Sequence, residues 1–188
     1  LPQRKLKMLF GVFKHGDMDD LVYAESVVAH HFGLIAEKQN IRVLELGPGE
    51  ALSTGIVLAE KYPNMSIDYL DVSDFAAESN YLYAEHLEKR GENQGNESAL
   101  VRFLQVSHSR YFTNGLEDLR KLENDSYDFI FSHAVMEHIY KDEIKEYIQN
   151  THRILRNGGM ISHQIDFRDH LGGRNFNLKF PNKLWESE

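Results

Sequence analysis

Two short stretches of the sequence gather side chains that can take up or release protons. Their histidine and acidic residues are His133, Glu137 and His138 in the first stretch, and His163, Asp166, Asp169 and His170 in the second. Histidine suits the role of a base because its unperturbed pKa is about 6.5. We expect His170, Asp166 and His133 to be catalytic, with His170 as the base that removes a proton from a substrate hydroxyl.

A glycine turn near the middle of the chain could hold a ligand beside these groups. Residues 41–51 read IRVLELGPGEA, an apolar run that carries the single acid Glu45 and breaks at Gly47 and Gly49 before a helical pattern begins at Leu52. Glycine permits φ above zero and lets a ligand approach the backbone. The amides of a helix start carry partial positive charge. The pattern therefore predicts a buried strand, a tight turn and a helix N-terminus that together bind a nucleotide-type ligand.

An acidic residue follows the next predicted strand. Residues 66–72, SIDYLDV, come after the helix, so the chain forms a strand, a helix and a strand, which requires a parallel pair and a right-handed crossover. In such units an acid at this place can accept hydrogen bonds from both hydroxyls of a ribose. We predict Asp71 as the ribose ligand. Alternatively, Asp71 is an ordinary loop carboxylate or the cap of the next helix. Asp74 could cap that helix equally well.

These groups must be positioned by strands that alternate with helices. Predicted strands cover residues 41–46, 66–72, 100–106, 127–131 and 160–167, and predicted helices cover residues 17–39, 52–62, 75–89, 116–122 and 142–155. Such alternation is typical of a Rossmann-like α/β fold, a doubly wound, mainly parallel sheet with helices on both faces. We divide the chain into an N-terminal arm and helix (1–40), a core (41–170) and an irregular tail (171–188).

Some residues within these elements have a structural interpretation. Gly158 and Gly159 are expected to end the helix before the last strand in the left-handed conformation. His30 and His31 lie on the first predicted helix, where neighbouring positions face about 100° apart, and we interpret them as surface or boundary residues. His163 is either a site residue or a buried, hydrogen-bonded one.

The composition excludes several classes of protein. The 188 residues fit one domain, and 41% hydrophobic and 27% charged residues are typical of a soluble globular protein. A formal net charge of -8 argues against a nucleic-acid partner. The absence of cysteine excludes disulfides and thiolate catalysis. No apolar run is long enough to span a bilayer, and we expect a cytoplasmic protein. The start at Leu1 leaves a lost targeting segment open, and the oligomeric state is not predicted.

Four ordered motifs resemble those of class I S-adenosylmethionine-dependent methyltransferases. They are residues 45–51 (ELGPGEA), residues 70–73 (LDVS), the run from YDFI at residue 127 into MEH at residue 136, and residues 153–159 (RILRNGG). The third glycine of the first motif is replaced by Ala51, and Asn157 stands where proline is usual. More weakly, residues 162–170 (SHQIDFRDH) resemble a bacterial branch associated with polysaccharide biosynthesis.

The resemblance implies a methyltransferase that takes S-adenosyl-L-methionine as its methyl donor. The methionine portion would contact Gly47 and Gly49, with Glu45 near its amino group, and the ribose would bind Asp71. The adenine would lie near Ser107, His108, Ser132 and His133. The acceptor implied is a hydroxyl of a small molecule or a sugar, which a base would deprotonate.

Three alternatives stay open. A dinucleotide-binding loop of a NAD-dependent oxidoreductase would need a third glycine at position 52, which is Leu52. A metal held by His163, Asp166, Asp169 and His170 could orient two sugar hydroxyls, but the spacing matches no established motif, so no metal is predicted. The residues after His170 are too few for the helix and two antiparallel strands that usually complete such a sheet. We therefore expect a fragment whose C-terminal strands are missing, with a non-catalytic S-adenosylmethionine-binding domain as the alternative.

Overall fold

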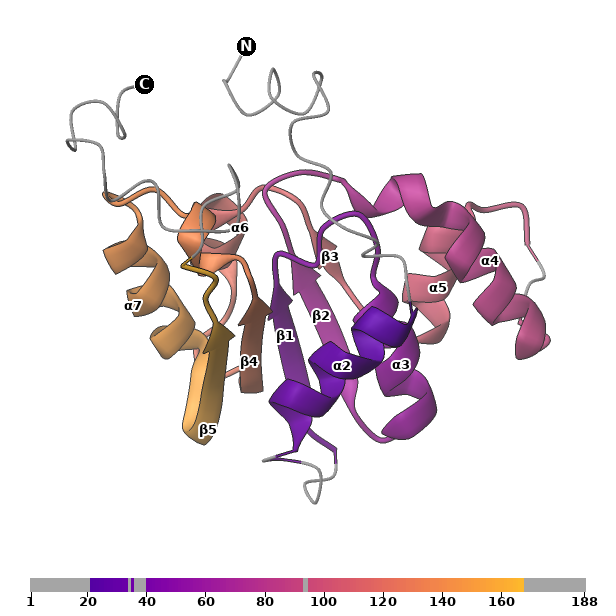
Figure 1. Cartoon of the computed structure of the whole chain (residues 1–188), viewed down its shortest axis with the longest axis horizontal. Helices are drawn as coiled ribbons and strands as arrows, with labels where there is room; N and C mark the ends of the chain where they lie inside the picture. The colour runs from indigo at the N-terminus through magenta and orange to yellow at the C-terminus, as the bar shows by residue number, and fades with distance from the viewer. Residues whose placement is uncertain (1–20, 34, 36–39, 93–94, 168–188) are drawn as a thin grey trace, which may run out of the picture.

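A computed structural model describes residues 21–33, 35, 40–92 and 95–167 of the chain (Figure 1). Its strands are β1 (Arg42–Leu46), β2 (Ser66–Leu70), β3 (Tyr111–Phe112), β4 (Tyr127–His133) and β5 (Leu155–Gln164). Its helices are α2 (Leu21–Phe32), α3 (Ser53–Lys61), α4 (Asn80–Lys89), α5 (Ala99–Val106), α6 (Leu116–Lys121) and α7 (Ile144–Ile154), with 3-10 turns η1 (Ala76–Ser79) and η2 (Met136–His138). In this described part, no helix is long and apolar enough to cross a membrane.

The five strands form one parallel sheet in the order β3-β2-β1-β4-β5. Strand β1 is central, and Leu46 at its carboxyl end is in register with Leu70 of β2 and with Ser132 of β4. The chain runs outward from β1 through β2 to β3 and then returns to β4 on the other side of β1. This reversal is the topological switch point, where ligands of open α/β sheets bind outside the carboxyl ends of the strands. The predicted α/β fold is confirmed.

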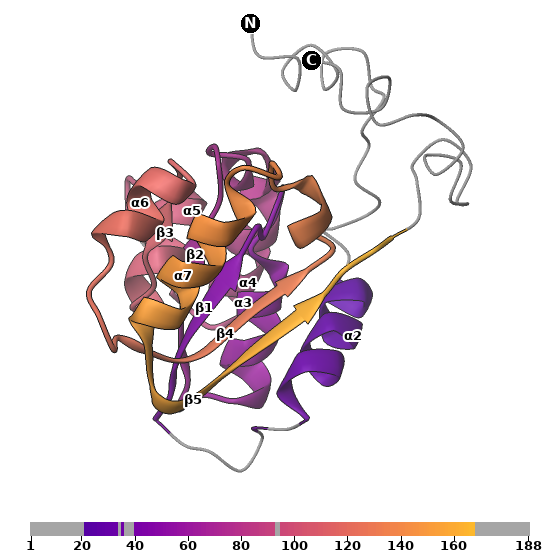
Figure 2. The same cartoon turned by 90° about the vertical axis from the view of Figure 1, so that its left-hand side faces the viewer.

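Each face of the sheet is covered by helices (Figure 2). Helices α2 and α7 lie on opposite sides of β4 and β5. Period-two alternation along the strands divides the core into two clusters. Val43, Phe129 and Phe131 pack with α2, α3, α4 and α5, whereas Leu44 and Ile130 pack with α6 and α7. The side of the sheet toward which a side chain points therefore decides which helices it can meet.

The predicted strand at residues 100–106 is wrong, because this segment is helix α5. Ser98 caps it, since its Oγ accepts a hydrogen bond from the amide of Val101, and Leu100 and Phe103 are buried at helical spacing. A short apolar run fits either a strand or a buried helix, so periodicity alone did not separate them. The third strand is instead the short β3, in which Tyr111 is in register with Tyr69.

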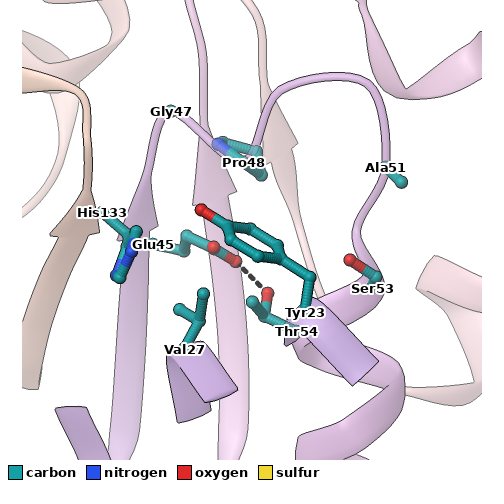
Figure 3. Close-up of a pocket in the computed structure, with 9 residues that line it drawn as sticks. All are labelled: Tyr23, Val27, Glu45, Gly47, Pro48, Ala51, Ser53, Thr54 and His133. Atoms are coloured by element: carbon teal, nitrogen blue, oxygen red, sulfur yellow. Dashed lines mark hydrogen bonds between the residues drawn. The ribbon is translucent and has the colours of Figure 1, made fainter. Parts of the chain in front are cut away.

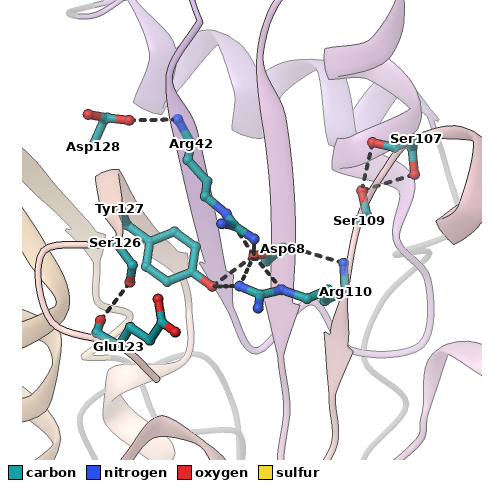
Figure 4. Close-up of polar contacts among 9 residues, drawn as sticks. All are labelled: Arg42, Asp68, Ser107, Ser109, Arg110, Glu123, Ser126, Tyr127 and Asp128. Atoms are coloured by element: carbon teal, nitrogen blue, oxygen red, sulfur yellow. Dashed lines mark hydrogen bonds and ion pairs between the residues drawn. The ribbon is translucent and has the colours of Figure 1, made fainter. Parts of the chain in front are cut away.

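A buried carboxylate secures this short edge strand to the sheet (Figure 4). Asp68 of β2 is 1% exposed and accepts hydrogen bonds from the backbone amide of Arg110 at 2.8 Å and from the hydroxyl of Tyr127 at 2.8 Å. The guanidinium groups of Arg42 and Arg110 each lie 2.9 Å from its Oδ2. Because Arg110 directly precedes β3, the cluster fixes where that strand joins β2.

The glycine pair at residues 158 and 159 lies within β5 and does not cap a helix. Helix α7 ends at Ile154, and its C-cap Leu155 is extended, with φ -77° and ψ 131°. Gly158 has φ +77°, as predicted for a left-handed residue, but it lies in an irregularity where β5 advances from Leu155 to Met160 while β4 advances from Tyr127 to Phe129. The positive φ therefore serves a bulge in the strand rather than a helix end.

Candidate functional site

The glycine turn lies at the switch point and requires glycine at position 47. Gly47 has φ +67°, and a Cβ built there would lie 2.6 Å from Cγ2 of Val135, in the loop after β4. The amide of Gly47 donates a hydrogen bond of 2.8 Å to the carbonyl of Leu70, at the end of β2. Gly49 also has a positive φ, of +77°. The turn is thus held between the ends of three adjacent strands.

Asp71 directly follows β2 and binds the same turn. Its Oδ2 accepts a hydrogen bond of 3.0 Å from the amide of Gly49, and its Oδ1 accepts one of 2.7 Å from the amide of Val72. The residue is 6% exposed. Asp71, the predicted ribose ligand, therefore lies directly against the turn that is predicted to hold the methionine portion.

Glu45 is a buried carboxyl group below the turn. It accepts a hydrogen bond from the hydroxyl of Thr54, in the first turn of α3. The pKa of Glu45 is raised to about 8, chiefly by burial; the hydrogen bond from Thr54 opposes the rise, and the nearby negative charge of Asp71 adds to it. The carboxyl is therefore mostly protonated at neutral pH, until a positively charged group lies beside it.

A small pocket opens in front of Glu45 (Figure 3). Its lining comes from α2, from the glycine turn, from the start of α3 and from the end of β4: Tyr23, Val27, Glu45, Gly47, Pro48, Ala51, Ser53, Thr54 and His133. The ring of Tyr23 lies between Pro48 and Glu45 and meets the ring of His133 edge-on, with centroids 5.8 Å apart. Helix α2 thus forms one wall of the pocket.

A histidine cluster, made of His30, His31 and His133, joins α2 to the end of β4. Nε2 of His31 lies 3.2 Å from Nδ1 of His133, and Nδ1 of His31 lies 2.8 Å from Oγ of Ser162 on β5. Burial, together with the neighbouring histidines, lowers the pKa of His31 to about 4. Burial also lowers the pKa of His133. These two rings are therefore neutral near pH 7.

The structure brings most of the predicted residues to one edge of the sheet. Glu45, Gly47, Gly49, Asp71 and His133 lie at or just beyond the carboxyl ends of β1, β2 and β4. Their assignment as cofactor ligands or, for His133, as a catalytic residue stays a prediction. Their convergence at one edge follows from the parallel sheet.

Ser132 lies among them but faces the other way. Alternation along β4 points Phe131 and His133 toward α2, and Ser132 toward the side of α7. Ser132 is fully buried, and its Oγ lies 2.8 Å from Nδ1 of His163. Its hydroxyl therefore has a partner away from the pocket. His163 is hydrogen-bonded, as in our second interpretation, but it is only partly buried.

Ser107 and His108 are placed wrongly by the sequence prediction. Because residues 100–106 form a helix, Ser107 is the C-cap of α5 and precedes β3 instead of following a strand. Its Oγ donates to the carbonyl of Phe103 at 2.7 Å and lies 2.9 Å from Oγ of Ser109 (Figure 4). The two residues therefore lie on the amino side of β3, away from the edge where the other predicted ligands meet.

Of the two other predicted catalytic residues, the structure describes Asp166 but not His170. Asp166 follows β5, and its amide donates a hydrogen bond of 3.2 Å to Oε1 of Glu137. Asp169 and His170 lie outside the described residues. Within the ranges that the structure describes, no group of three or more histidine, aspartate or glutamate side chains could hold a metal ion.

Sequence reasoning missed two parts of this site. His31, interpreted as a surface or boundary residue, is fully buried against His133, and Tyr23 lines the pocket. Only the packing of α2 onto β4 and β5 reveals these two residues, since nothing local in the helix marks the residues that it will meet.

Comparison with known proteins bears on both fold and site. A model of the methyltransferase domain family matches residues 44–161, which include the glycine turn, Asp71 and His133. No curated protein matches the sequence significantly.

Solved structures give the same fold. The chain is similar to 1,6-didemethyltoxoflavin-N1-methyltransferase of Burkholderia thailandensis, with 16% identity, a TM-score of 0.51, and coverage of 85% of this chain and 57% of that chain. It is also similar to coclaurine N-methyltransferase, with 14% identity, a TM-score of 0.50, and coverage of 73% and 33%. Two further matched structures are covered over 49% and 55% of their length, so the chain spans about half the length of the structures it resembles.

Proposed function

The chain belongs to the methyltransferase domain family, and from this premise we propose that it binds S-adenosyl-L-methionine on the glycine turn and transfers the methyl group to a hydroxyl acceptor. The observation that carries the proposal is the link between Gly49 and Asp71 at the switch point. It joins a turn that only glycine can form at position 47 to an acid that can bind a ribose.

The residues present fit this cofactor. The close approach of Gly47 to Val135 leaves no room for a side chain, so the turn that lines the pocket requires glycine at this position. Asp71 supplies carboxylate oxygens for two hydroxyls. Glu45 supplies a buried carboxyl group that would become charged beside the ammonium group of the methionine portion. Such a site suits an amino-acid moiety better than a phosphate, because the pocket lining contains an acid and neither lysine nor arginine.

The bound cofactor supplies an electrophilic methyl group on a sulfonium, and the protein must align the acceptor with it and remove the acceptor's proton. His133 lies at the end of β4 in the pocket that contains Glu45 and Gly47. Its lowered pKa keeps the ring neutral near pH 7, which is the form that can accept a proton. We therefore assign the role of base to His133 among the described residues. Asp166 and His170 stay proposed catalytic residues.

We propose a small molecule or a sugar as the acceptor. The net charge of -8 disfavours a nucleic acid. The case for a sugar depends on the resemblance of residues 162–170 to a polysaccharide-biosynthesis branch, to which the comparisons add no support. The two relatives named above methylate nitrogen by their names, but their low identity carries no information on the acceptor of this chain.

Isothermal titration calorimetry of the folded chain with S-adenosyl-L-methionine and with S-adenosyl-L-homocysteine tests the proposal. We expect binding of both, and no binding of NADH. Binding of NADH alone would instead favour the oxidoreductase alternative. The structure already weakens that alternative, because Leu52 stands where a dinucleotide loop has its third glycine, is fully buried and donates its amide to the hydroxyl of Tyr83 at 3.0 Å.

A labelled methyl donor separates an enzyme from a non-catalytic domain. Transfer of label to a hydroxyl compound in a pool of small molecules and oligosaccharides is the expected result. Binding without transfer to any acceptor would favour a domain that binds the cofactor and does not catalyse the reaction.

A further inference from the structure

His31 is a buried histidine with a hydrogen-bond partner at each ring nitrogen. Nδ1 lies 2.8 Å from Oγ of Ser162, and Nε2 lies 3.2 Å from Nδ1 of His133. The ring is fully buried and packs against Phe131, with centroids 5.1 Å apart. Three elements, α2, β4 and β5, are therefore connected through one side chain that does not itself line the pocket.

The two hydrogen bonds are coupled through the neutral rings. A neutral imidazole donates from one nitrogen and accepts at the other. If His133 donates from Nδ1 to Nε2 of His31, then His31 must donate from Nδ1 to Ser162, and Nε2 of His133 carries a lone pair. If the order is reversed, Nε2 of His133 carries the proton and cannot act as a base.

We propose that His31 is a positioning residue, which holds His133 in the Nδ1–H tautomer so that Nε2 of His133 is the base for the acceptor hydroxyl. The inference deepens the proposed function and depends on it only for the identity of the reaction. Ser162 is the terminal acceptor of the chain of hydrogen bonds. The arrangement resembles other catalytic histidines in that a partner at Nδ1 orients the ring, although here the partner is a neutral imidazole.

The proposed methyl transfer conserves atoms and charge. The acceptor oxygen forms a bond to the methyl carbon while the carbon–sulfur bond of the cofactor breaks, and the electron pair of that bond stays on sulfur. The hydroxyl proton moves to Nε2 of His133, which becomes an imidazolium. The positive charge thus passes from sulfur to His133, where the hydrogen bond to Nε2 of His31 stabilises it.

Other ionisable groups around His133 come from several elements. They are His30, His31 and Tyr23 on α2, and Glu45 on β1, with Glu137 close to Tyr23. In the protein without cofactor, Glu45 is mostly protonated near pH 7. In the complex, its negative charge would be balanced by the ammonium group of the methionine portion, which limits its effect on the proton affinity of His133. A neutral partner at Nδ1 is consistent with a base that stays unprotonated at neutral pH.

Long-range 1H–15N NMR of the histidine rings in the full chain tests the inference without any substrate. We expect the Nδ1–H tautomer for His133 in the wild type. In His31→Phe, which keeps a buried ring but removes both hydrogen bonds, we expect the signals to move toward the Nε2–H tautomer that a free histidine prefers. The matched control is His86→Phe, because His86 on α4 is 6% exposed and packs against Phe103 on α5. This control should leave the signals of His133 unchanged.

Each outcome decides the inference. An Nε2–H tautomer of His133 in the wild type, or unchanged His133 signals in a folded His31→Phe variant, would overturn it. If His31→Phe does not fold, Ser162→Ala takes its place, because loss of the terminal acceptor should also release the tautomer. Unchanged His133 signals in Ser162→Ala would then contradict the inference.

Cofactor binding separates this inference from the proposed function. Both variants should bind S-adenosyl-L-methionine within about threefold of the wild type, while kcat for an identified acceptor falls about tenfold or more. If the wild type binds no cofactor, the proposed function fails, but the NMR result still decides whether His31 sets the tautomer of His133.

Discussion

The backbone amide of Gly49 donates a hydrogen bond of 3.0 Å to Oδ2 of Asp71, so the predicted ligand turn is connected to the predicted ribose ligand. Together with the bond between Gly47 and the carbonyl of Leu70, it gives the turn two attachments to the end of β2. The site therefore needs little rearrangement of the turn to receive a ligand.

Replacement of the acid should weaken cofactor binding. We expect Asp71→Asn to raise the Kd for S-adenosyl-L-methionine about 10- to 100-fold, because a hydrogen bond to a charged group contributes about 1.5–3 kcal/mol. Calorimetry measures the change. The control is Asp74→Asn, which alters the exposed acid that could equally cap a helix. A larger loss in Asp74→Asn than in Asp71→Asn would mean that the ribose ligand is misassigned.

Gly47→Ala should destabilise the fold and prevent cofactor binding. The new Cβ would lie 2.6 Å from Cγ2 of Val135, and the residue would also be strained at φ +67°. Gly91→Ala is a matched control, since Gly91 has φ +70° and nothing within 4 Å of the added Cβ. We expect a loss of about 1–2 kcal/mol for the control from backbone strain alone, and a larger loss for Gly47→Ala in chemical denaturation. Equal losses of stability in the two variants would show that Val135 moves away from the added Cβ at no cost in free energy.

Glu45 should make the stability of the fold decrease as the pH rises. The pKa of Glu45 is raised from 4.5 to about 8 in the folded chain, so the folded state keeps a proton that the unfolded state loses. The stabilisation is complete below the unfolded pKa and is lost as the pH rises to about 8, by up to about 1.4 kcal/mol per pH unit. In Glu45→Gln, the difference in melting temperature between pH 5 and pH 8 should be smaller than in the wild type. A parallel decrease in both proteins would contradict the assignment.

Binding of the cofactor should release a proton from Glu45. The ammonium group of the methionine portion favours the charged carboxylate, and this lowers the pKa of Glu45 from about 8. At pH 7, the apparent binding enthalpy should therefore depend on the ionisation enthalpy of the buffer. The same titration with Glu45→Gln should show less dependence. Equal proton release from the two proteins would place the titrating group elsewhere.

Asp68 should matter for stability and not for binding. Asp68→Asn removes a buried charge that accepts several hydrogen bonds, and its arginine partners are 35% and 50% exposed, so we expect a loss of about 1–3 kcal/mol. We expect the denaturation midpoint to fall while the Kd for the cofactor stays within about threefold. Glu85→Gln, in an exposed pair with Lys89, should leave the midpoint nearly unchanged.

The sequence was informative where a local pattern determines the structure. The run before Gly47 and the turn itself predicted β1 and its carboxyl end, and Asp71 followed from the crossover to β2. The error at residues 100–106 has a physical cause, because seven residues of mixed apolar character suit a buried helix as well as a strand. That error moved the predicted adenine contacts to Ser107 and His108, on the wrong side of β3.

The rest of the site could not be predicted because it depends on packing between distant elements. His31 and His133 are connected only because α2 crosses the ends of β4 and β5. Tyr23 reaches the pocket for the same reason. The strand pattern alone shows that Ser132 and His133 point to opposite faces of the sheet. It does not show on which face the cofactor pocket lies.

The position of β1 between β2 and β4 has a consequence for how the chain folds. The amide of Arg42 donates to Oδ2 of Asp128, a contact between residues 86 positions apart. One edge of β1 can pair with β2 early, but the other must wait for β4 to be synthesised. Closing so long a loop is slow, and the first half of a growing chain therefore exposes an unpaired apolar strand. We therefore expect the pairing that creates the ligand edge to be a late event in folding.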